Sequence, residues 1–109
     1  MQYLRSVDRH QLTQPLDKWG NGALHFAAEH NKTEVVKQLL DLGIPINVTS
    51  PVGYTPLHNA AVSGSLEVLT YLLERKADVY ARTVKHNQQL PIHKAAQEGH
   101  LSCVKALIA

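Results

Sequence analysis

Histidine and cysteine are the residue types in this sequence that could bind a metal or exchange protons. The chain has seven histidines and one cysteine. His25, His58 and His93 are separated by 33 and 35 residues, whereas a zinc site needs four Cys or His ligands that fall in close pairs. The remaining histidines have no partner at such a spacing either. We therefore predict no metal and no cofactor.

Other catalytic arrangements are missing from the sequence as well. There is no glycine-rich phosphate loop, no pair of carboxylates in a recognisable pocket, and no nucleophile beside a base. Cys103 falls on the inward face of an expected helix, where a buried and unreactive thiol is expected. The sequence therefore predicts a protein that is not an enzyme.

Composition narrows the class of partner and the compartment. Eleven Lys and Arg residues face nine Asp and Glu residues, so the chain lacks the basic excess of a nucleic-acid-binding protein. No apolar run is long enough to insert into a membrane. Because Cys103 cannot form an internal disulfide, we expect an intracellular protein, cytoplasmic or nuclear.

The three spaced histidines belong to a repeated heptapeptide. Residues 55–61 read Thr-Pro-Leu-His-Asn-Ala-Ala, and related sequences occupy 22–28 and 90–96. Thr55 is suited to cap a helix, Pro56 to begin it, and Gly64 to end it in a left-handed conformation. A second apolar helical pattern follows each heptapeptide. The expected helices are 23–30, 33–41, 56–63, 66–74, 91–98 and 101–108.

This heptapeptide with a period near 33 resembles the ankyrin-repeat family. The resemblance implies an all-α solenoid of antiparallel helix pairs with projecting hairpin fingers. We divide the chain into an N-terminal capping segment or degenerate repeat (1–16) and three repeats (17–49, 50–84 and a truncated 85–109). The resemblance to ankyrin repeats also implies that His25, His58 and His93 are buried and form hydrogen bonds at the bases of the fingers.

Some positions depart from the family pattern. Gly22 and Ala23 replace Thr-Pro, so the first repeat loses its cap, and Asn31 replaces a helix-ending glycine. The last helix ends at Ala109 with an apolar outer face, and terminal repeats usually carry a polar one. We expect more ankyrin repeats or another domain beyond Ala109, or self-association of this chain.

The resemblance implies a protein-interaction module that binds a partner protein through its finger tips and concave groove. An alternative is the recognition segment of a larger enzyme, such as a signalling enzyme or a bacterial effector that acts in the host cytosol. Phe26 and Asn59 lie among the exposed groove positions that the pattern predicts. The expected partner-binding residues are Lys18, Trp19, Asn21, His30, Val52, Tyr54, Ser63, His86, Asn87, Gln89, Lys94 and Gln97.

Several of these residues have two interpretations. Trp19 and Tyr54 could anchor a partner or only shield the neighbouring finger. The polar loop Val84–Gln89 could be a contact loop or a tolerated insertion. Asn47 resembles a finger asparagine that is hydroxylated in some ankyrin proteins, but we favour a structural residue that bonds its own turn.

Overall fold

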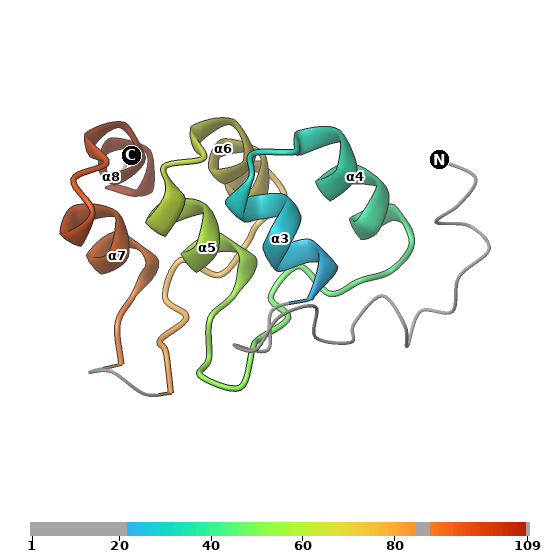
Figure 1. The fold of residues 1–109 in the computed structure, drawn as a ribbon, viewed down its shortest axis with the longest axis horizontal. Coiled ribbons are helices and arrows are strands. Elements are labelled where there is room, and N and C mark those ends of the chain that lie inside the picture. The colour runs from blue at the N-terminus through green and yellow to red at the C-terminus, as the bar shows by residue number, and fades with distance from the viewer. Residues whose placement is uncertain (1–21, 85–87, 109) are drawn as a thin grey trace.

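The computed structural model describes residues 22–84 and 88–108, which form three antiparallel helix pairs stacked in a row (Figure 1). The helices are α3 (Ala23–Glu29), α4 (Thr33–Asp41), α5 (Pro56–Ser63), α6 (Leu66–Glu74), α7 (Pro91–Gln97) and α8 (Leu101–Ile108). This confirms the all-α ankyrin solenoid. Two expected helices were one residue too long, because His30 and Glu98 are the C-capping residues of α3 and α7.

The helices begin as their first residues predict. The Thr55 side chain accepts a hydrogen bond from the His58 backbone N–H at 3.3 Å, and Pro56 follows in the first turn of α5. Gly22 offers no capping side chain to α3, as expected. There the Gly22 backbone N–H donates to His25 Nδ1 at 3.2 Å, so the imidazole ring organises the turn.

The helices end at left-handed residues. Asn31 has φ 58°, Gly64 φ 76° and Lys76 φ 68°, so an asparagine and a lysine adopt the conformation that glycine adopts elsewhere. The Asn31 side chain also accepts a hydrogen bond from the Val68 backbone N–H at 3.1 Å. This substitution for glycine therefore ties the first helix pair to the second.

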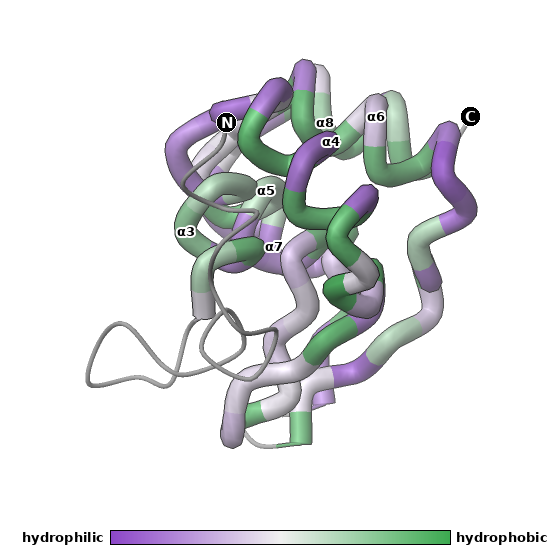
Figure 2. The backbone as a smooth tube through the Cα atoms, turned by 90° about the vertical axis from the view of Figure 1, so that its right-hand side faces the viewer, coloured by the Kyte–Doolittle hydropathy of each residue, from purple (hydrophilic) through white to green (hydrophobic). Residues whose placement is uncertain are grey.

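The core lies between two layers of helices. Figure 2 looks along the row and shows α3, α5 and α7 in one layer and α4, α6 and α8 in the other. We call these the inner and the outer helices. Small residues, such as Ala28, Ala60 and Ala61, let neighbouring inner helices approach closely, and larger aliphatic side chains fill the space behind them. The largest fully buried aliphatic side chains are Leu24, Val36, Leu39, Leu57, Val68, Leu69 and Leu72.

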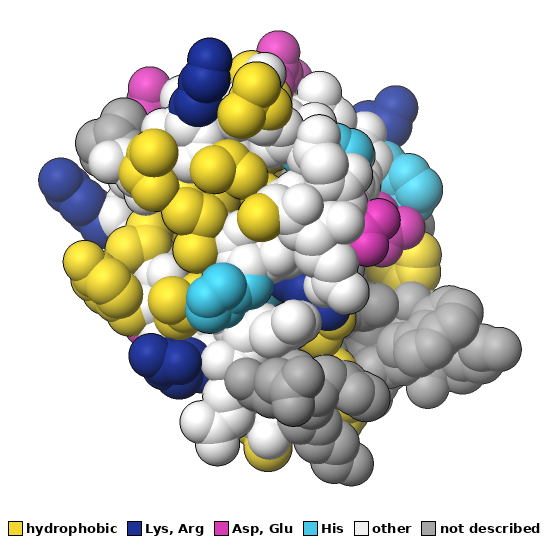
Figure 3. Space-filling model, turned by 90° about the vertical axis from the view of Figure 1, so that its left-hand side faces the viewer, with side chains coloured by type: hydrophobic (Ala, Val, Ile, Leu, Met, Phe, Trp, Pro, Cys, Tyr) yellow, Lys and Arg dark blue, Asp and Glu magenta, His cyan; other side chains and the backbone are white. Residues whose placement is uncertain are grey.

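The end of the row formed by α7 and α8 is apolar and open. Figure 3 views this end and shows hydrophobic side chains gathered above a histidine. Leu101 is 64% exposed and Ile108 68% exposed, while Val104 and Leu107 are half-buried. Val104, Leu107 and Ile108 were expected to be exposed on the outer face of the last helix, and of these only Ile108 is. We call this surface the end face.

The segments between the pairs project together below the helices (Figure 1). The Val84 N–H donates to the carbonyl of Val52 at 2.8 Å, which joins the second finger to the first. The Asn47 side chain accepts from the Asp78 backbone N–H at 3.0 Å. Our prediction that Asn47 bonds its own turn is therefore wrong, because its amide reaches the following finger.

Candidate protein-binding surface

Two buried histidines link successive repeats. His25 Nε2 lies 2.9 Å from the carbonyl oxygen of Tyr54, and His58 Nε2 lies 3.0 Å from that of Gln89. His58 Nδ1 accepts from the Thr55 backbone N–H at 3.1 Å, so Nε2 carries the proton and donates to Gln89. Burial lowers the pKa of His58, and the charge of Lys94 lowers it further, although the Gln89 carbonyl opposes both. The ring is therefore neutral and structural, as predicted.

His93 does not follow its two counterparts, and the prediction that it is buried is wrong. Its Nδ1 accepts from the Leu90 backbone N–H at 3.0 Å, so the local turn repeats. The side chain is nevertheless exposed, because no described segment lies against α7 on its far side. The heptapeptide sets the orientation of the ring, whereas a neighbouring repeat supplies its burial.

Side chains of the inner helices and their caps, together with Tyr54 just before α5, lie along one side of the row, which we call the inner-helix face. The Tyr54 ring is half-buried and lies 5.5 Å from the His58 ring. The ammonium of Lys94 lies 5.1 Å from the centroid of the Tyr54 ring, within range of a cation–π contact. The face comprises Phe26, His30, Tyr54, Asn59, Ser63, Lys94 and Gln97.

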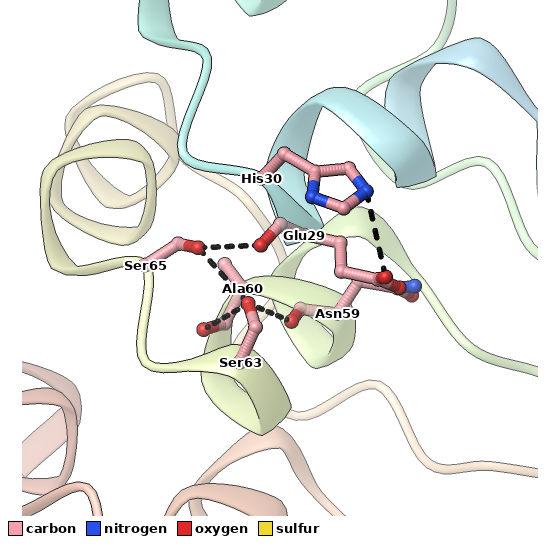
Figure 4. A network of polar contacts seen from close by, with 6 residues as sticks. All are labelled: Glu29, His30, Asn59, Ala60, Ser63 and Ser65. Atoms are coloured by element: carbon pink, nitrogen blue, oxygen red, sulfur yellow. Dashed lines mark hydrogen bonds and ion pairs between the residues drawn. The ribbon is translucent and has the colours of Figure 1, made fainter.

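His30 and Ser63 lie where α3 meets α5. The His30 ring stacks on Phe26 with 6.2 Å between centroids, and its Nε2 lies 3.7 Å from the Glu29 carboxylate. Ser63 Oγ donates to the carbonyl of Asn59 at 2.9 Å (Figure 4). Both residues were expected on this face, and both hold contacts that order it.

Asn59 was expected to be exposed, but only 5% of its surface is accessible. It occupies the heptapeptide position that holds Phe26 in the first repeat and Lys94 in the third. Its side-chain oxygen Oδ1 is buried and accepts no hydrogen bond from the described residues. The close packing of α5 between α3 and α7 accounts for the burial.

Gln89 and Gln97 meet at the end of the row. Together with His93 and Ala96 they line a hollow of about 540 Å³. Both glutamines were expected contact residues, whereas His93 was expected to be structural. Its place in the hollow follows from the position of α7 at the end of the described helices, which the heptapeptide itself does not signal.

A larger groove, of about 770 Å³, lies between outer helices α4 and α6. Tyr71 stands in it with Lys37 Nζ 5.4 Å and Arg75 Cζ 5.7 Å from its ring centroid, and Arg75 donates to its hydroxyl at 2.7 Å. Thr33 donates to the Glu67 carboxylate across the groove. This groove was not expected from the sequence, because its residues follow the pattern of a solvated outer face.

Five expected contact residues, Lys18, Trp19, Asn21, His86 and Asn87, lie outside the described residues. Of the remaining seven, Val52 is half-buried and engaged through its carbonyl in the finger contact. The structure brings Tyr54 and Lys94 together, and separately Gln89 and Gln97.

The described residues hold no arrangement suited to metal catalysis. Within 22–84 and 88–108, no three His, Cys, Asp or Glu side chains lie where they could share a metal ion. Cys103 is buried, and burial raises the pKa of its thiol, which keeps it protonated and unreactive. Among the same residues, no helix is long and apolar enough to cross a bilayer.

Comparison with known families agrees with this geometry. The chain matches ankyrin repeats, as three copies, over residues 1–83, and a further ankyrin repeat over 87–109. It belongs to the ankyrin-repeat family, whose repeats form a non-catalytic fold that mediates protein interaction. Where one repeat ends and the next begins stays a prediction.

Similar proteins are larger than this chain. It is 35% identical over 89 residues to tyrosine-protein kinase Shark of Drosophila melanogaster, covering 82% of this chain and 9% of the kinase. The probable E3 ubiquitin-protein ligase XBOS32 of Oryza sativa is 36% identical, with 82% and 18% covered. The mouse B-cell lymphoma 3 protein homolog is 34% identical, with 85% and 21% covered. The chain thus spans about a fifth or less of each relative.

Proposed function

We propose that this chain binds a partner protein through the inner-helix face and the adjoining fingers, and takes no catalytic part itself. The observation that carries the proposal is the pair of half-buried aromatic side chains, Phe26 and Tyr54, on the face of a non-catalytic interaction fold. Aromatic rings in such settings are favoured anchors at protein interfaces. Trp19, Lys18, Asn21, His86 and Asn87 belong to the same proposal from sequence alone. An intracellular location, which the lone cysteine favours, completes it.

Peptides selected from a phage-displayed random library provide a ligand for testing this proposal. Trp19→Ala should weaken binding of a selected peptide by at least about 2 kcal/mol, with thermal unfolding nearly unchanged. Lys37→Ala, in the groove between the outer helices, is the control and should leave the affinity unchanged. Equal losses from the two substitutions would reject binding at the inner-helix face.

A second proposal is that this chain is the recognition segment of a larger enzyme. Its support is that two similar proteins are a tyrosine kinase and a probable ubiquitin ligase, of which it spans only a small part. The sequence of the complete coding region decides between the two. An adjoining catalytic domain supports the enzyme, and ankyrin repeats alone support the simple module.

We further propose that another helix pair, another domain or a second copy covers the end face. Leu69 and Leu72 of α6 are fully buried, whereas their counterparts in α8, Val104 and Leu107, are half-buried. Light scattering of the 109-residue chain should show a mass that rises with concentration. Ile108→Lys should suppress the rise, and a monomer at every concentration would contradict self-association.

A further inference from the structure

The inner-helix face presents a positive charge that no carboxylate of the described residues neutralises. Lys94 is half-buried, and its ammonium lies over the Tyr54 ring at 5.1 Å. The ion pairs among the described residues are His30 with Glu29 and Lys37 with Glu34, so Lys94 has no carboxylate partner there. An ammonium on a ring and partly out of water is held in place and attracts an anion strongly.

The polar side chain at the equivalent position of the preceding repeat is closed to a ligand. Asn59 occupies the equivalent heptapeptide position one repeat earlier, on the helix that packs against α7. Its Oδ1 is buried and accepts no hydrogen bond from the described residues. A bound molecule therefore meets the half-buried Lys94 at this heptapeptide position rather than the buried Asn59.

The charge of Lys94, held over the Tyr54 ring and without a carboxylate partner among the described residues, leads to a specific ligand on the basis of the binding function proposed above. We propose that the inner-helix face binds an acidic peptide segment. An Asp or Glu carboxylate of that segment pairs with Lys94. Lys94 is then a residue that determines specificity.

The surrounding charges favour a peptide over a nucleic acid. Glu29 and Glu98 lie at the ends of inner helices α3 and α7, and both are exposed. A polyphosphate backbone would bring several negative charges close to these carboxylates, whereas a peptide can place one carboxylate on Lys94 alone. The near balance of basic and acidic residues in the whole chain agrees with this choice.

Selection of random phage-displayed peptides on the unmodified chain and on Lys94→Glu tests the proposal. Peptides from the unmodified chain should be enriched in Asp and Glu. Selection on Lys94→Glu should lose this enrichment. Lys105→Glu is the matched control, since Lys105 lies exposed on outer helix α8 of the same pair, and should retain it.

Titration of the strongest acidic peptide then measures the effect of the charge. Lys94→Gln should weaken binding by about tenfold or more, Lys94→Arg should retain it, and Lys105→Gln should leave it unchanged. Replacing the peptide's own Asp or Glu by the amide should weaken binding to the unmodified chain equally, which tests the pairing without altering the protein.

The possible failures are distinguishable. Enrichment of peptides without acidic residues, or equal affinity for Lys94→Gln and the unmodified chain, would overturn the acidic ligand and leave the binding function standing. Absence of any enriched peptide would overturn the binding function and this inference together. A single-stranded oligonucleotide that binds more tightly than every selected peptide would overturn the choice of a peptide ligand.

Discussion

The second and third helix pairs follow the same sequence pattern but differ in burial. His58 and His93 both accept a hydrogen bond at Nδ1 from the backbone N–H three residues earlier. His58 is fully buried between α5 and the next finger, whereas His93 is exposed. The same holds in the outer helices, where Leu72 is fully buried and its counterpart Leu107 is half-buried.

This difference shows that each repeat sets its own local geometry and that its neighbour supplies its stabilisation. A helix of about two turns is unstable alone in water, so packing against the adjacent pair supplies most of the favourable free energy. Equivalent substitutions in α5–α6 and α7–α8 should therefore have unequal effects on stability.

The largest difference is expected in the outer-helix core. Leu72→Ala should lower the free energy of unfolding by about 2–5 kcal/mol, because it leaves a cavity in a fully packed site. Leu107→Ala should cost at most about half as much, since solvent already reaches that side chain. Urea unfolding of both variants measures this, and equal losses would contradict the role of the neighbouring pair.

The glycines that follow the inner helices form a second matched pair. Gly64 and Gly99 have nearly equal φ angles, 76° and 77°, so alanine at either should cost about 1–2 kcal/mol of backbone strain. A Cβ on Gly64 would also lie 2.7 Å from the His100 ring, whereas a Cβ on Gly99 meets no atom within 4 Å.

Gly64→Ala must therefore displace His100 and weaken its 3.0 Å contact with the Val62 carbonyl, at a further cost of about 1 kcal/mol. Thermal unfolding of the two alanine variants gives the difference directly. If Gly99→Ala proves the more damaging substitution, the close approach of His100 does not constrain the fold.

Replacing His58 should likewise cost more stability than replacing its counterpart His93. His58→Ala leaves the buried Gln89 carbonyl without its donor and should destabilise the chain by about 1–3 kcal/mol, without changing peptide specificity. His93→Ala changes an exposed side chain and should cost less than about 0.5 kcal/mol. Unchanged melting with lost peptide binding in His58→Ala would reverse its structural assignment.

A smaller effect is expected from pH. Burial lowers the pKa of His58 below its ordinary value of 6.5, aided by the charges of Lys94 and His25, so the unfolded chain takes up a proton more readily. Stability from this group is complete above pH 6.5 and is lost as the pH falls below it. The comparison is with His58→Gln, whose free energy of unfolding should fall less steeply as the pH is lowered. Parallel curves for the two proteins would show that His58 does not contribute.

The sequence predicted the fold nearly to the residue, because each signal was local. The Thr55 cap, the left-handed Asn31 and the apolar spacing of each outer helix act within one or two turns. Four of the six helices have the expected bounds, and the other two differ by one residue. Such local signals predict the same helix boundaries in every repeat, whatever its position in the row.

The surface was harder to predict, because its properties depend on what lies beside each residue. The pattern could not show that Asn59 is buried, that Asn47 reaches Asp78, or that His93 is exposed. Nor could it show that Lys94 extends to Tyr54, since the two belong to different repeats. The contact is visible only once the helices are placed side by side.

Backbone hydrogen exchange, measured with and without a selected peptide, locates the surface at which the peptide binds. A peptide bound at the inner-helix face should slow exchange in α5, α7 and the finger segment around Tyr54, and leave the outer helices α4 and α6 unchanged. Slowed exchange confined to α4 and α6 would place the binding site in the outer groove and contradict binding at the inner-helix face.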